Sequence, residues 1–165
     1  MTDTKRLYYE DVYIKEFSAK VVECRKEEKG FQVILDQSAF YPEGGGQPSD
    51  LGILGDTAVT DVQEKNGELI HYVKSELEPG TEVIGKIDWQ RRFDLMQQHS
   101  GEHIVSGLVH EAYGYNNVGF HMSSDVITID FSGVLDEKQL AEIEEKTNRN
   151  IWEDNPVEIF YPDKE

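Results

Sequence analysis

Hydrophobic and polar positions alternate in short stretches over roughly the first ninety residues. These stretches are rich in Val, Ile, Phe and Tyr, and Lys-Gly, Asn-Gly and Pro-Gly turn signals separate them. The pattern predicts strands around Phe17–Cys24, Phe31–Asp36, Thr57–Val62, Glu68–Val73 and Thr81–Ile87. Five or six strands at this spacing are typical of a small barrel or sandwich.

The pattern then changes to a helical period over Trp89–Tyr113, where turn residues are few and five residues recur at helical spacing: Phe93, Met96, His99, His103 and Leu108. We expect this face of the helix to point to the core. Asp88 is expected to cap the helix and Gly114 to end it. Gly101 and Gly107 each cost roughly 1 kcal/mol relative to Ala, which suggests that another part of the backbone approaches closely there.

After Gly114 we expect two strands, a second helix and a final short strand. The first two strands fall at about Val118–His121 and Val126–Phe131. Asp136 is expected to cap a second helix that reaches Trp152 and whose partly buried face carries Leu140, Ile143 and Ile151. A last short strand is expected at Val157–Tyr161. This order of elements predicts an α+β fold.

Composition sets limits on the function. Of the 165 residues 38% are apolar, which is enough for a hydrophobic core. The sequence contains no run of 18 apolar residues, so it predicts no membrane-spanning helix. The single cysteine, Cys24, excludes an internal disulfide and suits a cytoplasmic protein. The net charge of -17 argues against nucleic acid, unless a local basic patch exists. The candidates for such a patch are Lys5, Arg6, Arg91 and Arg92.

The segment His99-Ser100-Gly101-Glu102-His103 holds the densest group of candidate metal-binding and catalytic side chains in the chain. Histidines four apart lie on one face of a helix and can share one metal ion; the alternative is a pair of ordinary helix histidines. Further ligands could come from His110, His121 or Cys24, whereas His71 is expected at the surface of a strand.

The same five residues also fit the H-x-x-E-H pattern of inverted zinc peptidases, with Glu102 as general base. That pattern needs a downstream glutamate as third ligand, for which Glu142, Glu145 and Glu153 are available.

Gly44, Gly45 and Gly46 form a triple-glycine bend between Pro42 and Pro48. Consecutive glycines permit positive φ and close approach of another chain or ligand, and the prolines limit that freedom. The loop is therefore expected to have a defined shape. Because no Gly-Lys-Ser or Gly-Lys-Thr follows, a nucleotide P-loop is not expected. The alternative is a tight barrel turn that needs small residues.

Phe40–Gly52 matches the pattern Phe-Tyr-x-Glu-x-Gly-Gly-Gln-x-x-Asp-x-Gly, and Arg92–His103 matches Arg-x-x-x-Met-x-x-His-Thr/Ser-x-x-His. Asp130–Ser132 reads Asp-Phe-Ser. In this order and at this separation the three segments resemble the editing domains of alanyl-tRNA synthetase and the free-standing alanyl-tRNA editing proteins of the AlaX type. The resemblance spans nearly the whole chain.

The resemblance implies a small β-barrel domain at 1–88, which carries the glycine-rich loop, joined to a metal-binding α+β editing domain at 89–165. In the second domain the His-bearing helix packs on an antiparallel sheet. The implied activity is zinc-assisted hydrolysis of the ester that links serine or glycine to alanine tRNA. The family holds zinc with a His-x-x-x-His pair, here His99 and His103, and a later Cys-x-x-x-His pair. Because the chain ends at Glu165 before that second pair, we expect an N-terminal fragment with an incomplete zinc site.

Within that reading, Ser100 and Glu102 are the catalytic candidates. Zinc could anchor the amino group, polarise the ester or activate water. Ser100 and Asn116 or Asn117 are candidates for polar contacts to the serine side chain, and Tyr41 could stack on a terminal base or be a core aromatic. The residues expected to bind substrate or tRNA are Tyr41, Gly44, Gly45, Gly46, Gln47 and Asn117. A tRNA- or protein-binding module without catalysis is the alternative from another class.

Overall fold

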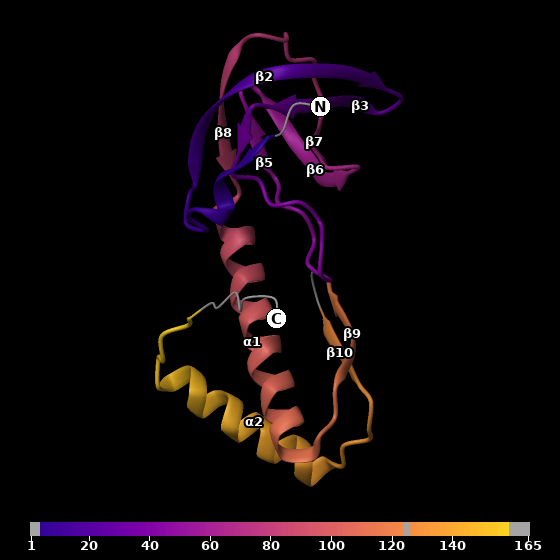
Figure 1. Cartoon of the computed structure of the whole chain (residues 1–165), viewed down its shortest axis with the longest axis vertical. Coiled ribbons are helices and arrows are strands. Elements are labelled where there is room, and N and C mark those ends of the chain that lie inside the picture. Colours follow the sequence, from indigo (N-terminus) through magenta and orange to yellow (C-terminus); the bar gives the residue numbers. More distant parts are fainter. Residues whose placement is uncertain (1–3, 124–125, 159–165) are drawn as a thin grey trace, which may run out of the picture. The chain divides into compact units, whose positions relative to one another are not determined.

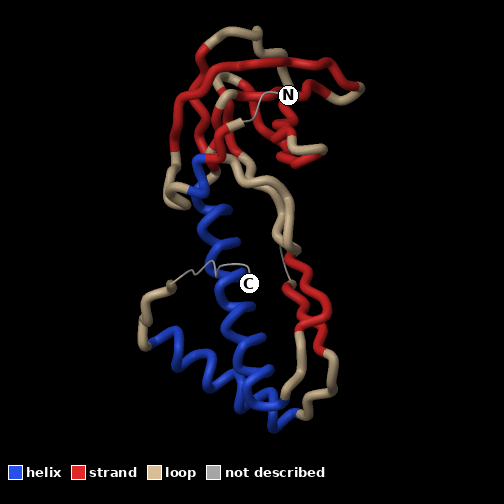
Figure 2. The backbone as a smooth tube through the Cα atoms, viewed as in Figure 1, coloured by secondary structure: helices blue, strands red, loops and turns tan. Residues whose placement is uncertain are grey.

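A computed structural model of the chain describes residues 4–123 and 126–158 and shows a mixture of strands and helices (Figures 1 and 2). The α+β class predicted from the sequence is therefore confirmed. Residue contacts divide the chain into two compact units. The first unit contains Met1–Gln97 and His121–Ile127, and the second contains Gln98–Phe120 and Thr128–Glu165.

Six antiparallel strands of the first unit form one sheet in the order β2-β3-β7-β6-β5-β8, and β8 pairs back to β2, so the sheet closes into a barrel. The strands are β2 (Glu16–Glu27), β3 (Gly30–Leu35), β5 (Gly52–Leu54), β6 (Thr57–Lys65), β7 (Glu68–Val73) and β8 (Glu82–Ile87). A small parallel pair, β1 (Lys5–Arg6) with β4 (Gln37–Ser38), and the short 3-10 helix η1 (Leu7–Tyr9) accompany it.

Side chains that point inward from alternate positions of the strands fill the interior of the barrel. In the first half of β2 and throughout β8 every second residue is buried, and the strand register pairs Phe17 of β2 with Gly85 of β8. A Cβ added at Gly85 would lie 2.4 Å from the Phe17 ring, so this position accepts only glycine. At the β6–β7 hairpin Asn66 and Gly67 both have positive φ, as a type I′ turn requires.

His71 corrects a prediction, because it lies in the barrel core and not at the surface. Its Nε2 lies 2.7 Å from the Ser38 hydroxyl, and its Nδ1 lies 3.1 Å from the Val33 carbonyl oxygen. The prediction assumed that β7 has one solvent-facing side, but four of its six residues are buried, among them three in succession. Burial lowers the pKa of His71 from 6.5 to about 4, and the Val33 contact opposes this shift.

The other elements are α1 (Trp89–Tyr113), β9 (Asn117–Met122), β10 (Ile127–Phe131) and α2 (Glu137–Trp152), and β9 and β10 form a two-stranded sheet. The predicted helix ends are confirmed. The Asp88 carboxylate accepts a hydrogen bond from the Arg91 amide at 3.2 Å, and Gly114 ends α1 with φ of 70°. Asp136 forms a capping box with Gln139 at the start of α2.

The buried face of α1 differs from the predicted one. It carries Arg92, Leu95, Glu102 and Val109, whereas Phe93 and His103 are exposed. The prediction was wrong for Phe93 and His103, because helical spacing alone does not show that the charged residues Arg92 and Glu102 are buried with hydrogen-bond partners. Among the described residues no atom lies within 4 Å of a Cβ built at Gly101 or Gly107, so the expected close approach of backbone is not found.

The predicted partly buried face of α2 is found at Ile143, which is buried, whereas Leu140 and Ile151 are exposed. The expected strand at Val157–Tyr161 falls largely on residues 159–165, outside the described residues. Neither helix in the described ranges combines the length and hydropathy needed to cross a bilayer.

The low pKa of His71 predicts a pH-dependent stability. Its folded pKa of about 4 lies below the ordinary value of 6.5, so between these values the unfolded state binds more protons. Its stabilising contribution is complete above pH 6.5 and is lost as the pH falls toward 4. From pH 7 to pH 5 we expect a loss of about 2 kcal/mol in the free energy of unfolding, measured by urea denaturation. His71→Gln should flatten this slope, whereas the exposed control His121→Gln should leave it unchanged.

Candidate functional site

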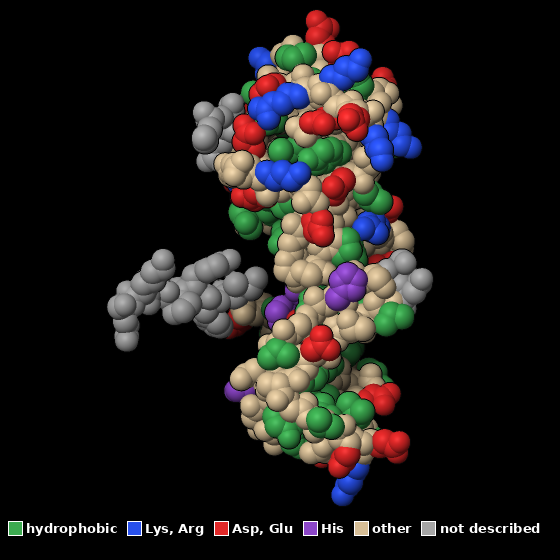
Figure 3. Space-filling model, turned by 90° about the vertical axis from the view of Figure 1, so that its right-hand side faces the viewer, with side chains coloured by type: hydrophobic (Ala, Val, Ile, Leu, Met, Phe, Trp, Pro, Cys, Tyr) green, Lys and Arg blue, Asp and Glu red, His purple; other side chains and the backbone are tan. Residues whose placement is uncertain are grey.

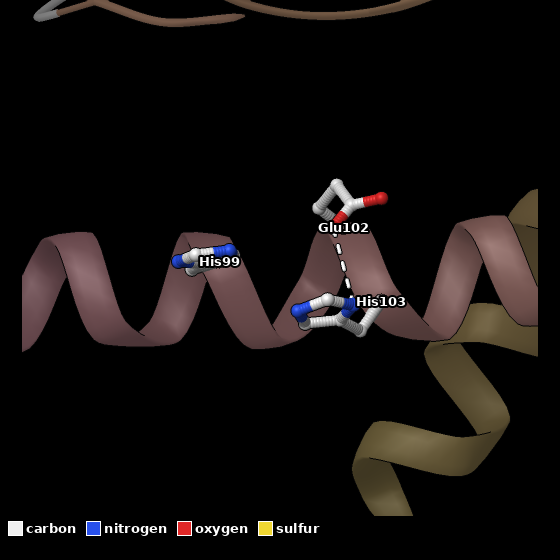
Figure 4. A group of neighbouring side chains, drawn as sticks. All are labelled: His99, Glu102 and His103. Atoms are coloured by element: carbon white, nitrogen blue, oxygen red, sulfur yellow. Dashed lines mark ion pairs between the residues drawn. The ribbon is translucent and has the colours of Figure 1, made fainter. Parts of the chain in front are cut away.

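The helix α1 presents His99 and His103 on one face. Their ring centroids lie 5.0 Å apart with an angle of 14° between the planes, so the two imidazoles are stacked (Figure 4). His99 also stacks on Phe120 of β9, with ring centroids 5.4 Å apart. The expected geometry of an i, i+4 pair is therefore present, and an aromatic neighbour restricts the orientation of one ring.

Glu102 lies beside this pair but points to the buried side of the helix. Its Oε2 is 3.4 Å from His103 Nδ1. Its Oε1 accepts hydrogen bonds from the Asn117 side-chain amide at 2.7 Å and from the Ser106 hydroxyl. Asn117 is itself held, because its Oδ1 accepts a hydrogen bond from the Gly119 amide at 3.0 Å. The carboxylate is therefore fixed by partners on α1 and on β9.

These residues fit a metal site by their chemistry. His99, Glu102 and His103 each offer one ligand atom, and these atoms all lie within 4.8 Å of one another. Two imidazoles and a carboxylate are ordinary zinc donors. Burial and then the neighbouring His103 lower the pKa of His99, while Glu102 opposes the shift. A lowered pKa keeps the imidazole neutral, the form that binds a metal ion.

The other candidate ligands do not join this group. Within the described ranges no second cluster of three or more His, Cys, Asp or Glu side chains could hold a metal ion. Cys24 lies in β2, half-buried against the barrel core. His71 is buried, as described above, and His110 and His121 are exposed.

The glutamates that an inverted peptidase would need are engaged elsewhere. On the exposed face of α2, Glu142 pairs with Lys146 at 2.7 Å and Glu145 pairs with Arg149 at 2.8 Å. Glu153 accepts a hydrogen bond from Asn155. None of the three belongs to the metal group found among the described residues, so the third ligand of that pattern is not provided here.

The glycine-rich loop has a defined shape. Gly44 and Gln47 exchange two backbone hydrogen bonds, of 3.1 and 3.0 Å, around a tight turn. The two central residues, Gly45 and Gly46, have φ of 59° and 82°, as a type I′ turn requires. Two further bonds hold the turn from outside, one from the Glu43 amide to the Val62 carbonyl oxygen and one from the Met122 amide to the Gly46 carbonyl oxygen. Gly44, Gly45 and Gly46 are exposed, and Gln47 is buried.

Tyr41 lies at the base of this loop and is half-buried against the barrel core. Its ring meets that of Tyr8 edge to face at 4.9 Å, and burial raises the pKa of its hydroxyl. Its amide donates to the Asp50 carboxylate at 2.7 Å. These contacts favour the core-aromatic alternative for Tyr41, and its contact with a base stays a prediction.

The four basic residues that were candidates for a phosphate-binding patch are buried or engaged with other groups. Arg92 is buried and cannot meet a phosphate. Arg6 pairs with Glu64 at 3.0 Å, Lys5 pairs with Glu10 at 2.9 Å, and Arg91 donates to the Ser49 carbonyl oxygen. On the face seen in Figure 3, Lys and Arg side chains are interspersed with Asp and Glu.

Two polar residues complete the surroundings of the histidine pair. Ser100, a catalytic candidate, is exposed on α1. Ser106, which holds Glu102, was missed by the sequence reasoning. Its position four residues after Glu102 on the same helix is the signal that would have identified it.

Asn116 and Ser132 are joined by two hydrogen bonds, from the Asn116 amide to the Ser132 hydroxyl and from the Ser132 amide to the Asn116 carbonyl oxygen.

Comparison with known proteins agrees with these features. Residues 2–91 match the model of the family described as class II (A) tRNA synthetases. The chain is 38% identical to the alanyl-tRNA editing protein AlaX-L of Pyrococcus horikoshii over 97% of its own length, and it covers 41% of that protein. It is 36% identical to the alanyl-tRNA editing protein Aarsd1 of Bos taurus, over 90% of the chain and 37% of the relative. Identity to the alanine–tRNA ligase of Pyrobaculum neutrophilum is 37%, over 93% of the chain and 18% of the ligase. The chain thus spans about two fifths of the length of these editing proteins.

The turn geometry predicts different effects for adjacent glycines. Gly45 has a φ of 59°, whereas Gly44 is not in the left-handed region, and neither has a neighbouring atom within 4 Å of an added Cβ. Gly45→Ala should therefore lower the free energy of unfolding by about 1 kcal/mol. Gly44→Ala, the matched control, should change it by less than about 0.5 kcal/mol. Equal losses in chemical denaturation would contradict the assigned turn.

Proposed function

Because this chain belongs to the family of class II (A) tRNA synthetases, we propose that it is an aminoacyl-tRNA hydrolase that removes serine or glycine from mischarged alanine tRNA. The names of its relatives, which are alanyl-tRNA editing proteins and alanine–tRNA ligases, support this activity. The observation that carries the proposal is the group formed by His99, Glu102 and His103 on α1. A cytoplasmic location follows from a role in translation.

Hydrolysis of mischarged tRNA is needed because serine and glycine resemble alanine closely. Serine exceeds alanine by one hydroxyl group, and glycine is smaller, so a synthesis site that binds alanine cannot strongly reject either of them. A separate hydrolytic site can remove the wrong amino acid after the ester has formed. In hydrolysis a water molecule adds to the ester carbonyl and the bond from that carbon to the ribose oxygen breaks. The ribose oxygen receives a proton, and free amino acid and tRNA are released.

His99 and His103 would hold a zinc ion at this site. Bound zinc supplies a Lewis acid that stabilises negative charge developing on the ester. Glu102 faces Nδ1 of His103, which leaves Nε2 of that ring for the metal. Carboxylate partners of this kind fix the orientation and tautomer of a ligating histidine. Asn117 and Ser106 in turn fix Glu102, so its role in this proposal is to position His103.

The remaining expected residues would bind the substrate. Ser100 is exposed one residue after His99 and offers a hydroxyl to the amino acid. The turn Gly44–Gln47 and Tyr41 would contact the acceptor end of the tRNA. In this proposal the chain consists of a barrel domain at 1–88 and an editing domain at 89–165.

The activity is tested with alanine tRNA that carries serine. Wild-type protein with added zinc should release serine well above the buffer rate, and His99→Ala or His103→Ala should reduce kcat/KM at least about a hundredfold, because a metal ligand is lost. His110→Ala, on the same helix but outside the metal group, should retain wild-type activity.

A wild-type protein that is folded and loaded with zinc but releases no serine or glycine would refute the proposed hydrolase. It would favour the alternative of a binding module without catalysis. Correctly charged alanine tRNA serves as the substrate control and should be hydrolysed more slowly.

The role of Glu102 predicts a change in zinc affinity. Glu102→Gln keeps the shape of the side chain but removes the charge that faces His103 Nδ1. Zinc affinity should fall by roughly 10–100-fold, as it does when such partners of metal ligands are changed. Competition with a chromophoric chelator measures this change. Glu142→Gln, which alters an exposed carboxylate on α2, is the control and should leave the affinity unchanged.

A further inference from the structure

Phe120 of β9 lies against His99 of α1. The phenyl ring and the imidazole are stacked, with their centroids 5.4 Å apart and an angle of 29° between their planes. At this separation two aromatic rings attract each other. Both residues belong to the second compact unit, so this is a contact within one unit. An apolar side chain without acid, base or ligand atoms thus contacts one member of the metal group directly.

A second contact fixes β9 against α1. Three residues before Phe120, the Asn117 side-chain amide donates to Glu102 Oε1 at 2.7 Å. The Asn117 Oδ1 in turn accepts a hydrogen bond from the Gly119 amide at 3.0 Å. The strand therefore meets the helix at two places, once through a polar side chain and once through the stacked rings. The position of the half-buried Phe120 ring is set by the strand that carries it.

His103 is held less closely than His99. Its side chain is 74% exposed, whereas His99 is half-buried. The Nδ1 of His103 lies 3.4 Å from Glu102 Oε2, which is longer than an ordinary N–H···O hydrogen bond. A turn of the His103 ring toward the carboxylate would shorten this contact to hydrogen-bond length.

The stacked histidines have to change their geometry to share one ion. The lone pair of an imidazole nitrogen lies in the plane of the ring, so a bound metal ion lies close to that plane. The rings of His99 and His103 are stacked with centroids 5.0 Å apart, and the angle between their planes is only 14°. Two stacked planes that are nearly parallel do not meet at a nearby ion. At least one of the two imidazoles must therefore turn when a metal ion binds.

We propose that Phe120 is a positioning residue that makes His99 the fixed ligand of the metal site, while His103 is the ligand that turns. Stacking on Phe120 orders the His99 imidazole during folding, so the entropy of ordering this side chain is not lost when the ion binds. The exposed His103 ring turns toward the ion, and this movement also brings its Nδ1 closer to Glu102. The inference rests on the metal site of the proposed function, and it does not rest on hydrolysis.

The variant Phe120→Leu tests this role, because it removes the ring and keeps an apolar side chain. Competition with a chromophoric chelator should show that zinc affinity falls at least about threefold, since His99 then has to be ordered during binding. Phe120→Tyr, which keeps the ring, should retain the wild-type affinity.

Phe131→Leu is the matched control. Phe131 is also half-buried and lies in β10 of the same sheet, and among the described residues its ring does not stack on a histidine. This variant should lower the melting temperature by an amount similar to that of Phe120→Leu. Its zinc affinity should change by less than about twofold, because the lost ring does not touch the metal group.

Nuclear magnetic resonance of the wild-type protein provides a readout that needs no variant. Without zinc, the ring protons of His99 should lie upfield of those of His110, an exposed histidine on the same helix, because the ring current of Phe120 acts on them. Nuclear Overhauser contacts between the rings of His99 and Phe120 should persist when zinc is added. Contacts between the rings of His99 and His103 should change, since His103 turns.

A folded Phe120→Leu variant whose zinc affinity falls by less than about threefold would overturn the proposal. Equal losses of affinity in Phe120→Leu and Phe131→Leu would also overturn it, because a general loss of stability would then account for both. Loss of the contacts between His99 and Phe120 on zinc binding would do the same, and this result is obtained even if Phe120→Leu does not fold.

The outcomes for the proposed function are separate. Wild-type protein that shows the expected zinc affinities and ring contacts but releases no serine would refute the hydrolase function and support the role of Phe120. Wild-type protein that binds no zinc would overturn both the role of Phe120 and the proposed metal site.

Discussion

The buried pair of Arg92 and Asp50 is the constraint on which the arrangement of the first unit depends. A guanidinium with this little exposure is tolerated only when its donors are satisfied, and here one carboxylate and two backbone carbonyl groups do so. The pair fixes where the loop ends and where α1 begins. Asp88 caps the same helix four residues earlier, so the entry of the chain into α1 is defined twice.

Side chains with long-range partners mark the limit of what the sequence can predict. Both helices were found with correct ends because their caps are local: Asp88 and Gly114 for α1, and Asp136 with Gln139 for α2. The Asn66-Gly67 hairpin was equally visible. Arg92 was misread as a phosphate contact because Asp50 lies far away in the chain. His71 was misplaced because only closure of the barrel shows that β7 is buried on both sides.

The contacts of the basic side chains add to the evidence from the acidic composition. Several basic side chains of the described structure are paired with carboxylates, as Arg25 is with Glu23 and Glu68 and as Arg149 is with Glu145. The charge of Arg92 is neutralised in the interior. Charge thus gives no support for RNA binding, and the assignment depends on the two motifs and on the family.

Of the candidate site, the sequence could indicate the histidine pair, since i, i+4 spacing is local, but it could not reveal the Asn117–Glu102 contact between α1 and β9.

The surroundings of Glu102 distinguish the two chemistries that its motif permits. In an inverted peptidase this carboxylate acts as a general base and needs an oxygen that is free to take a proton from water. Here Oε1 already accepts two hydrogen bonds, and Oε2 faces the ring of His103. A carboxylate held in this way is suited to orient an imidazole, because any movement would break contacts to both α1 and β9. Residues 99–103 thus fit both patterns, and the partners of Glu102 favour a positioning role over that of a general base.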